Sequence, residues 1–337
     1  MPPIQTGLLA YGMSGRVFHA PFLHTSPQFA LRAVVERNRK TAAETYPDII
    51  SYDSVDALLA DDALELVVIN TPNDTHFALA RQALEAGKHV LIEKPVATTV
   101  AELDELLALA QRQQRHLLAY QNRRWDSDFQ LVQQVVESGR LGELIEVHFR
   151  FDRYKLALNP KQFKEDPAAP GSGLSFDLGP HVLDQALSLF GQPVRHRLTR
   201  TSHRPGSRVD DYFHAHLEYP AGLNVFVAGS LLTAAPGPAY VLHGMAGSFQ
   251  KNRADAQETQ LVAGLSPTAP GYGHEPAGAE GVLTLATEPG QFSTEQLPAP
   301  VGSYAGLFDA VYRTMRHGRA FPVRPEQLRW QLEILAG

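Results

Sequence analysis

Two short segments of this sequence place ionisable side chains at spacings suited to proton transfer. Lys94 stands between Glu93 and Pro95, and these three residues directly follow the apolar run HVLI. Desolvation and a neighbouring cation, such as an oxidised nicotinamide ring, lower the pKa of a lysine and let it exchange a proton. Asp177 and His181 are four residues apart, which puts both on one face of a helix. Hydride transfer to or from a secondary alcohol needs a group that takes or gives the hydroxyl proton, and Lys94 or His181 suits that role.

Asp184 follows His181 by three residues and falls on the same predicted helix face. One histidine and two aspartates could bind zinc. We expect no metal, because a nicotinamide would already accept the electrons and the sequence holds no further ligand cluster. We expect Asp184 to cap or brace the helix, whereas Asp177 would accept a hydrogen bond from a substrate hydroxyl or from one of the two bases.

A glycine-containing segment near the N-terminus is suited to binding a dinucleotide. It follows the first apolar run and precedes a helical pattern, so its glycines would let the backbone approach a pyrophosphate at a helix N-terminus. Ala10 stands where the first glycine of G-x-G-x-x-G is expected, and Glu36 follows Gly15 by 21 residues, where a carboxylate would bind ribose hydroxyls. The alternative for Glu36 is a plain surface charge. The nucleotide contacts expected here come from Tyr11, Gly12, Met13, Ser14, Gly15, Glu36 and Arg37.

Two later apolar runs also end in polar residues. Ligands of open parallel sheets bind at the carboxyl ends of the strands, so these residues would line the same crevice. For Lys94, a structural lysine held in a salt bridge is the alternative. The further nucleotide contacts that we expect are Asn70, Thr71, Pro72, Asn73, His76, Glu93 and Lys94.

The elements that would position these residues alternate in the first part of the chain. Apolar runs typical of strands buried on both faces occupy residues 4–10, 29–36, 65–70, 89–93 and 116–120. Helical patterns occupy residues 74–86 and 99–112. This β-α-β order predicts an α/β fold with a doubly wound parallel sheet.

The pattern changes after residue 120. Predicted strands occupy residues 144–154, 212–219, 223–231, 240–243, 247–251 and 282–287, and predicted helices occupy residues 129–137, 177–190, 304–317 and 325–335. Strands that follow one another without helices between them indicate an α+β domain with a largely antiparallel open sheet. Two loops rich in Pro and Gly, 157–173 and 264–281, are either binding segments or solvated surface loops.

Composition excludes several classes of protein. The 337 residues suffice for about two domains. A net charge of −6, with no basic cluster interleaved with aromatics, argues against a nucleic-acid partner. The absence of cysteine excludes disulfides, Cys-ligated zinc and thiol catalysis. Because no signal peptide or long apolar stretch is evident, we expect a cytoplasmic protein without a membrane partner.

Two motifs resemble those of a known family. Glu93-Lys94-Pro95 and the segment GSGLSFDLGPHVLD, which contains Asp177 and His181, are similar to the hallmarks of the glucose-fructose oxidoreductase and inositol dehydrogenase (Gfo/Idh/MocA) family. The segments QNRRWD and VDDYF resemble a branch that includes scyllo-inositol dehydrogenases. The resemblance implies a Rossmann NAD(P)-binding domain over residues 1–120. It also implies a substrate-binding and oligomerisation domain over residues 121–337, and a homodimer or homotetramer.

Together these observations predict an NAD(P)-dependent oxidoreductase acting on a polyol, inositol or sugar-like alcohol. Lys94, Asp177 and His181 would be catalytic, and Arg124, Trp125, Tyr154, Asp177 and His181 would bind the substrate. The alternatives are a non-catalytic dinucleotide sensor, or a redox-assisted glycosidase or lyase with tightly held NAD. Because Glu36 would repel a 2′-phosphate, the prediction favours NAD over NADP, although Arg37, Arg39 and Lys40 pull the other way.

Overall fold

The computed structural model describes residues 1–160 and 164–337, and the chain forms two compact units. The first unit comprises Met1–Asn122, Glu258–Tyr272 and Ser303–Pro325. The second comprises Arg123–Gln257, Gly273–Gly302 and Glu326–Gly337. The expected division after residue 120 lies close to the end of the first segment. The two later segments of the first unit, however, had been expected in the second domain.

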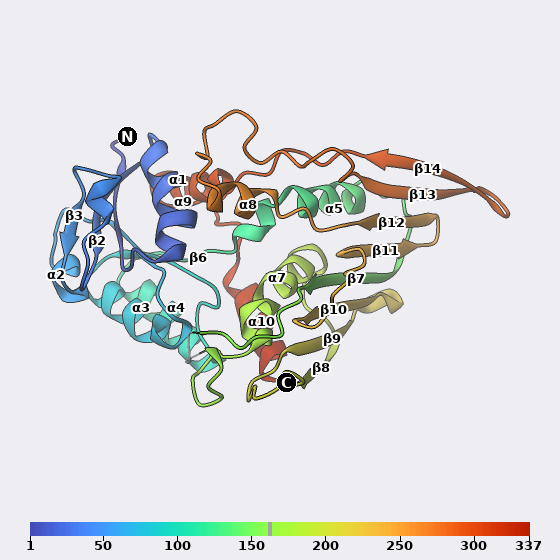
Figure 1. Ribbon diagram of the computed structural model, residues 1–337, viewed down its shortest axis with the longest axis horizontal. Helices are drawn as coiled ribbons and strands as arrows, with labels where there is room; N and C mark the ends of the chain where they lie inside the picture. Colours follow the sequence, from blue (N-terminus) through green and yellow to red (C-terminus); the bar gives the residue numbers. More distant parts are fainter. Residues whose placement is uncertain (161–163) are drawn as a thin grey trace. The chain divides into compact units, whose positions relative to one another are not determined.

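The first unit is built on a six-stranded parallel sheet in the order β3-β2-β1-β4-β5-β6. Figure 1 labels β2, β3 and β6 of this sheet. Its strands are β1 (Ile4–Leu8), β2 (Phe29–Val35), β3 (Ile50–Tyr52), β4 (Leu66–Ile69), β5 (His89–Ile92) and β6 (Leu117–Ala119). The order reverses between β1 and β4, and in such sheets the crevice at this reversal, beyond the carboxyl ends of the strands, binds ligands. The predicted doubly wound parallel sheet is confirmed.

Helices from the N-terminal segment and from the two later segments complete the first unit. They are α1 (Ala20–Thr25), α2 (Val55–Leu59), α3 (His76–Glu85), α4 (Val100–Arg112), α9 (Ala305–His317) and most of α8 (Ala256–Val262). Phe308 of α9 stacks on Phe22 of α1 with 5.3 Å between ring centroids, and it meets Phe29 of β2 edge-on at 6.0 Å. A segment near the end of the chain therefore belongs to the apolar core of the N-terminal sheet.

The second unit is built on an eight-stranded sheet in the order β14-β13-β12-β11-β7-β10-β9-β8. Its strands are β7 (Leu144–Asp152), β8 (Arg195–Thr201), β9 (Tyr212–Glu218), β10 (Asn224–Ser230), β11 (Tyr240–Gly244), β12 (Gly247–Lys251), β13 (Gly281–Glu288) and β14 (Gln291–Leu297). In the described part of this second sheet, only β7 and β10 pair in parallel, which confirms the largely antiparallel sheet.

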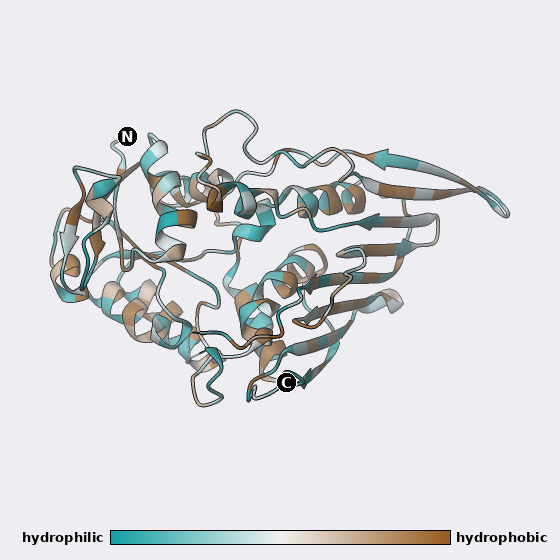
Figure 2. Cartoon of the chain, viewed as in Figure 1, coloured by the Kyte–Doolittle hydropathy of each residue, from teal (hydrophilic) through white to brown (hydrophobic). Residues whose placement is uncertain are grey.

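The sequence analysis missed the two edge strands of this sheet. β8 reads RHRLTRT and β14 reads QFSTEQL, so neither offers the apolar alternation that predicts a strand. Much of β14 has the teal of hydrophilic residues in Figure 2. Polar edge strands of this kind discourage pairing with further chains.

The helices of the second unit are α5 (Ser127–Glu137), α6 (Leu174–Asp177), α7 (Gly179–Phe190) and α10 (Pro325–Ala336). Their apolar residues join those of the sheet in one core. The single helix predicted over residues 177–190 was wrong at its start. The first helix ends before Leu178, and a second helix begins at Gly179-Pro180. Proline is favoured in the first turn of a helix, because its missing N–H would have no partner there. In the described part of the chain, no helix is long and apolar enough to cross a membrane.

Candidate active site

The glycine-containing loop that follows β1 is held by the end of β4. The Asn70 side chain donates a hydrogen bond to the carbonyl oxygen of Ala10 (2.8 Å) and accepts one from its N–H (3.1 Å). A Cβ on Gly15 would lie 2.9 Å from Asn70 Nδ2 and closer still to the Ala10 carbonyl oxygen, so only glycine fits there. At Gly12 an added Cβ would meet nothing within 4 Å. The backbone is therefore open at Gly12 and closely packed at Gly15, with alanine accommodated at position 10.

The end of β5 holds the same loop from a second side. One oxygen of the Glu93 carboxylate accepts hydrogen bonds from Ser14 Oγ (2.7 Å) and from His19 Nε2 (2.9 Å). Burial alone would raise the pKa of Glu93, but the hydrogen bonds from His19 and Ser14 outweigh it and the pKa lies below its usual value. His19 is fully buried in a π-helical turn, Gly15–His19, a rare geometry that is frequent at functional sites. Glu93, the residue before Lys94, thus joins the end of β5 to the loop.

The turn that contains Lys94 is fixed by His76. The His76 ring has Nδ1 2.7 Å from the carbonyl oxygen of Pro95 and Nε2 3.0 Å from that of Thr71. Burial lowers the pKa of His76, and the nearby charges of Glu93 and Lys94 act on it in opposite directions. Its ring connects the turns that follow β4 and β5. The structure therefore gives His76 a role in holding backbone turns, whereas the sequence had suggested a direct nucleotide contact.

The remaining residues predicted after β4 form a short turn. Thr71 and Thr75 share a hydrogen bond between their hydroxyls (2.7 Å), and Thr75 also donates to the carbonyl oxygen of Pro72 (2.6 Å). Asn73 begins the 3-10 turn that leads into α3. These residues stand at the carboxyl end of β4, as the sequence predicted.

Glu36 differs most from its predicted role. Its carboxylate accepts hydrogen bonds from the N–H of Thr41 (2.7 Å) and Ala42 (3.2 Å) and from the hydroxyl of Ser51 (2.8 Å). Burial alone would raise the pKa of Glu36, but these bonds lower it. Because its oxygens already stabilise the turn after β2, the carboxylate has little capacity left for ribose hydroxyls. The next residue, Arg37, is exposed and has no ion-pair partner within residues 1–160 and 164–337.

Tyr11 and Met13 lie at the outer side of the loop. The Tyr11 ring meets Tyr46 edge-on, with centroids 6.4 Å apart. Burial raises the pKa of both hydroxyls, that of Tyr46 to about 12, so both phenols stay protonated at neutral pH. The Met13 side chain is 48% exposed. Both side chains thus flank the loop where a nucleotide would approach.

Of the two predicted catalytic residues in the second unit, Asp177 is partly exposed and His181 is buried. Asp177 ends α6, its side chain is 43% exposed, and it lies 3.4 Å from Lys164 Nζ. His181 is buried in the first turn of α7 and lies 6.4 Å from the Phe151 ring. The sequence analysis missed Lys164, although the residue lies in the Pro/Gly-rich loop 157–173 that had been noted as a possible binding segment. Residues 161–163 of that loop lie outside the described part of the chain.

Arg124 and Asp184 form a buried pair. Arg124 donates two hydrogen bonds of 2.7 Å to the Asp184 carboxylate and a third of 3.0 Å to Gln327. Burial raises the pKa of Asp184, although the Arg124 charge opposes the shift. Asp184 therefore braces the helix, as expected. These bonds engage Nε and Nη2 of the guanidinium, and the substrate contact predicted for Arg124 stays a prediction.

The other predicted substrate residues differ in exposure. The Tyr154 side chain is 62% exposed beyond β7, and Trp125 is half-buried, with its carbonyl oxygen accepting a hydrogen bond from Gln257 (2.9 Å). In the described residues, no group of three or more His, Asp or Glu side chains is arranged to hold a metal ion. Tyr154 thus remains available to a ligand.

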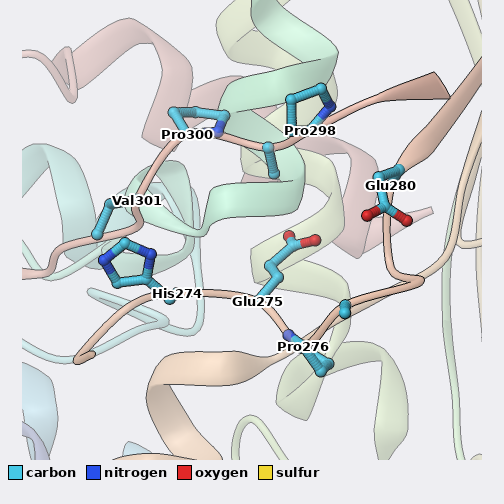
Figure 3. A pocket seen from close by; sticks show the side chains of 9 residues that line it. His274, Glu275, Pro276, Glu280, Pro298, Pro300 and Val301 are labelled. Carbon is cyan, nitrogen blue, oxygen red and sulfur yellow. The ribbon is translucent and has the colours of Figure 1, made fainter.

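A hollow of about 200 Å³ in the second unit lies apart from these residues in the sequence (Figure 3). Its lining comes from residues 274–277, 280 and 298–301. The Glu275 carboxylate beside it accepts hydrogen bonds from Ser127 Oγ and Lys251 Nζ, each 2.6 Å long. The Glu275 carboxylate is therefore used for internal bonding.

Comparison with known proteins extends over nearly the whole chain. Residues 4–121 match the oxidoreductase family with an NAD-binding Rossmann fold, and residues 129–250 match the GFO/IDH/MocA C-terminal domain. The uncharacterized oxidoreductase YdgJ of Escherichia coli is 35% identical, over 98% of this chain and 94% of its own. The scyllo-inositol 2-dehydrogenase (NADP(+)) IolW of Bacillus subtilis is 31% identical, over 96% and 89%. An oxidoreductase structure from Bacillus cereus, 32% identical, matches with a TM-score of 0.90 over 99% of this chain and 95% of its own.

Proposed function

The chain belongs to the GFO/IDH/MocA family of NAD-binding oxidoreductases, and on that premise we propose that it transfers hydride between NAD(P) and a secondary alcohol of a polyol, inositol or sugar-like substrate. One relative is named as an inositol dehydrogenase and another, 41% identical over 34% of this chain, as UDP-N-acetylglucosamine 3-dehydrogenase. These names support an alcohol as the reacting group.

One observation carries the proposal. Glu93 bonds to Ser14 of the glycine-containing loop and precedes Lys94 in the chain. The segment suited to a pyrophosphate and the lysine suited to proton transfer are therefore held together by one short hydrogen bond. A mere structural lysine would not need this connection to the loop.

The chemistry divides between the cofactor and the side chains. A bound nicotinamide supplies the hydride acceptor or donor. The Lys94 amine takes the hydroxyl proton during oxidation, or returns it during reduction, with the His181 imidazole as the other candidate. The Asp177 carboxylate accepts a hydrogen bond from the substrate and orients it. Tyr154, Trp125 and Arg124 stay candidates for further substrate contacts, and Tyr154 is the most exposed of the three.

We also propose that Arg37, and not Glu36, decides how the protein discriminates between NAD and NADP. The hydrogen bonds of Glu36 to Thr41, Ala42 and Ser51 reduce its use as a ribose acceptor. Arg37 is exposed beside it, and guanidinium groups bind phosphate well. These contacts support acceptance of NADP as well as NAD.

Replacement of Lys94 tests the proposed function. With a polyol that the wild type oxidises, Lys94→Ala should lower kcat at least about 100-fold and change the nucleotide Kd little, because the lysine acts on the proton. Nicotinamide absorbance gives the rate, and calorimetry gives the Kd. The control is Arg112→Ala, which removes an exposed cation at the end of α4.

Three outcomes would count against the proposal. Near-normal turnover of Lys94→Ala would contradict the role of the lysine. Nucleotide binding without turnover of any polyol or sugar would favour a sensor. Product formation without net change in nicotinamide absorbance would favour a redox-assisted glycosidase or lyase.

A further inference from the structure

The loop that precedes α6 is fastened by a buried ion pair. The Arg204 guanidinium lies 3.0 Å from both oxygens of Glu165, and the two side chains are 2% and 13% exposed. Glu165 also accepts hydrogen bonds from Ser207 Oγ (3.2 Å) and from the N–H of Asn159 (2.8 Å). A buried, multiply bonded carboxylate of this kind fixes the backbone next to it.

The same network is connected to the segment that carries Asp177. The N–H of Arg204 donates to the Asp211 carboxylate (2.6 Å), which is fully buried. Its neighbour Asp210 accepts hydrogen bonds from the N–H (2.6 Å) and hydroxyl (3.1 Å) of Ser175 in α6. The loop and α6 are therefore held in one frame that does not depend on Lys164 or Asp177.

Lys164 and Asp177 project from this frame and keep access to solvent. Their side chains are 39% and 43% exposed, and the ammonium nitrogen lies 3.4 Å from the carboxylate oxygen. Exposed ion pairs contribute little to stability, typically below about 1 kcal/mol. Stability therefore does not explain why a buried network places this particular pair side by side.

We propose that Lys164 is a further substrate-binding residue, and that the Lys164–Asp177 pair holds two neighbouring hydroxyl groups of a polyol. The carboxylate accepts a hydrogen bond from one hydroxyl, and the ammonium donates one to the oxygen of the next. Oxygens on adjacent carbons of a polyol lie about as far apart as the two partner atoms do. The inference rests on the proposed function, in which Asp177 contacts the substrate, and it narrows the substrate class to vicinal diols.

Kinetics with matched substrates test the inference. The wild type should use 1,2-cyclohexanediol with a kcat/KM about tenfold above that for cyclohexanol, as expected for loss of one charge-assisted hydrogen bond. Lys164→Met should raise KM for the diol about tenfold, leave kcat within about threefold, and abolish the preference for the diol. Lys164→Arg should restore most of that preference, because it returns a donor.

Arg208→Met is the matched control. Arg208 pairs with Asp166 at the same 3.4 Å distance near the same loop, but it does not contact Asp177. Its kinetics should equal those of the wild type. Equal diol preference in the wild type and in Lys164→Met would overturn the inference, and so would the same loss of preference in Arg208→Met.

A second readout does not depend on turnover. In pulse acylation followed by mass spectrometry, a saturating diol should protect Lys164 at least about threefold, and Asp177→Asn should remove the protection. If the wild type oxidises the diol but Lys164 is not protected, the inference fails while the proposed function stands. If Lys164 is protected but no nicotinamide-linked turnover occurs, the proposed function fails while diol binding by this pair stands.

Discussion

The loop after β1 and the end of α6 differ in how their polar side chains are used. Around the loop, Asn70 and Glu93 are already bonded to Ala10, Ser14 and His19. At the end of α6, Asp177 and Lys164 instead keep about two fifths of their side-chain surface exposed. Under the proposed function, the first arrangement would shape the backbone for the nucleotide, and the second would leave side chains accessible to the substrate. Rigidity and accessibility thus separate the proposed cofactor and substrate sites.

Gly15→Ala should break the first arrangement most severely. The added methyl group would collide with the Ala10 carbonyl and with Asn70, so the loop must move away from the end of β4. We expect about a 100-fold loss of nucleotide affinity by calorimetry, together with unchanged acylation of Lys164 in the second unit. Gly237→Ala, where a Cβ meets nothing within 4 Å, is the control. Unchanged affinity in Gly15→Ala would show that the close packing of the loop is irrelevant to binding.

Arg37 and Glu36 allow the same comparison within the nucleotide site, because Arg37 is exposed whereas Glu36 is hydrogen-bonded to the turn after β2. Arg37→Ala should lower kcat/KM for NADP about tenfold more than for NAD, since it removes only a phosphate partner. Glu36→Ala should lower nucleotide affinity for both cofactors alike, because the turn at Thr41 and Ala42 loses its acceptor. Steady-state kinetics with each cofactor separate the two. A strong shift of Glu36→Ala toward NADP would restore the role first predicted for its carboxylate.

The smallest expected effect is on the free energy of unfolding of the first unit, which should fall in acid because of His89. Its Nδ1 accepts a hydrogen bond from the N–H of His116 (3.0 Å), and burial lowers its pKa to about 4. Between about pH 6.5 and 4 the unfolded chain binds this proton and the folded chain does not, so stability falls as the pH falls. We expect a loss of about 1 kcal/mol, discounted for partial exposure. His89→Asn keeps an acceptor without titrating, and its urea midpoint should be less sensitive to acid; an identical pH dependence would contradict this assignment.

The architecture followed from sequence wherever burial left an apolar pattern. Strands such as β4, with four consecutive buried residues, were recognisable without knowledge of their neighbours. β8 and β14 could not be recognised in this way, because backbone hydrogen bonds hold an edge strand in its sheet even when its side chains are polar. The break at Leu178 was missed because the helical period of the flanking residues continues across it.

At the candidate site, residue types were predictable but partners were not. The sequence identified Glu36, Arg124 and His76 as polar residues at informative places. Whether each faces a ligand depends on Ser51, Asp184 and Pro95, which lie 15, 60 and 19 residues away and carry no local signal. Lys164 was missed for the same reason, since its partner Asp177 lies 13 residues away, and Arg204, which pairs with the neighbouring Glu165, lies 39 residues from it.

The late segment that contains α9 has a consequence for synthesis of the chain. Phe308 packs on Phe22 and Phe29, yet the ribosome makes these two residues 286 and 279 positions earlier. Until Ser303–Pro325 leaves the ribosome, the aromatic side chains that α9 covers in the folded protein stay exposed on the N-terminal part of the nascent chain. A fragment ending at Asn122 would keep those side chains exposed, so a nucleotide-binding module of this protein cannot be excised by a single cut after the last strand of its sheet.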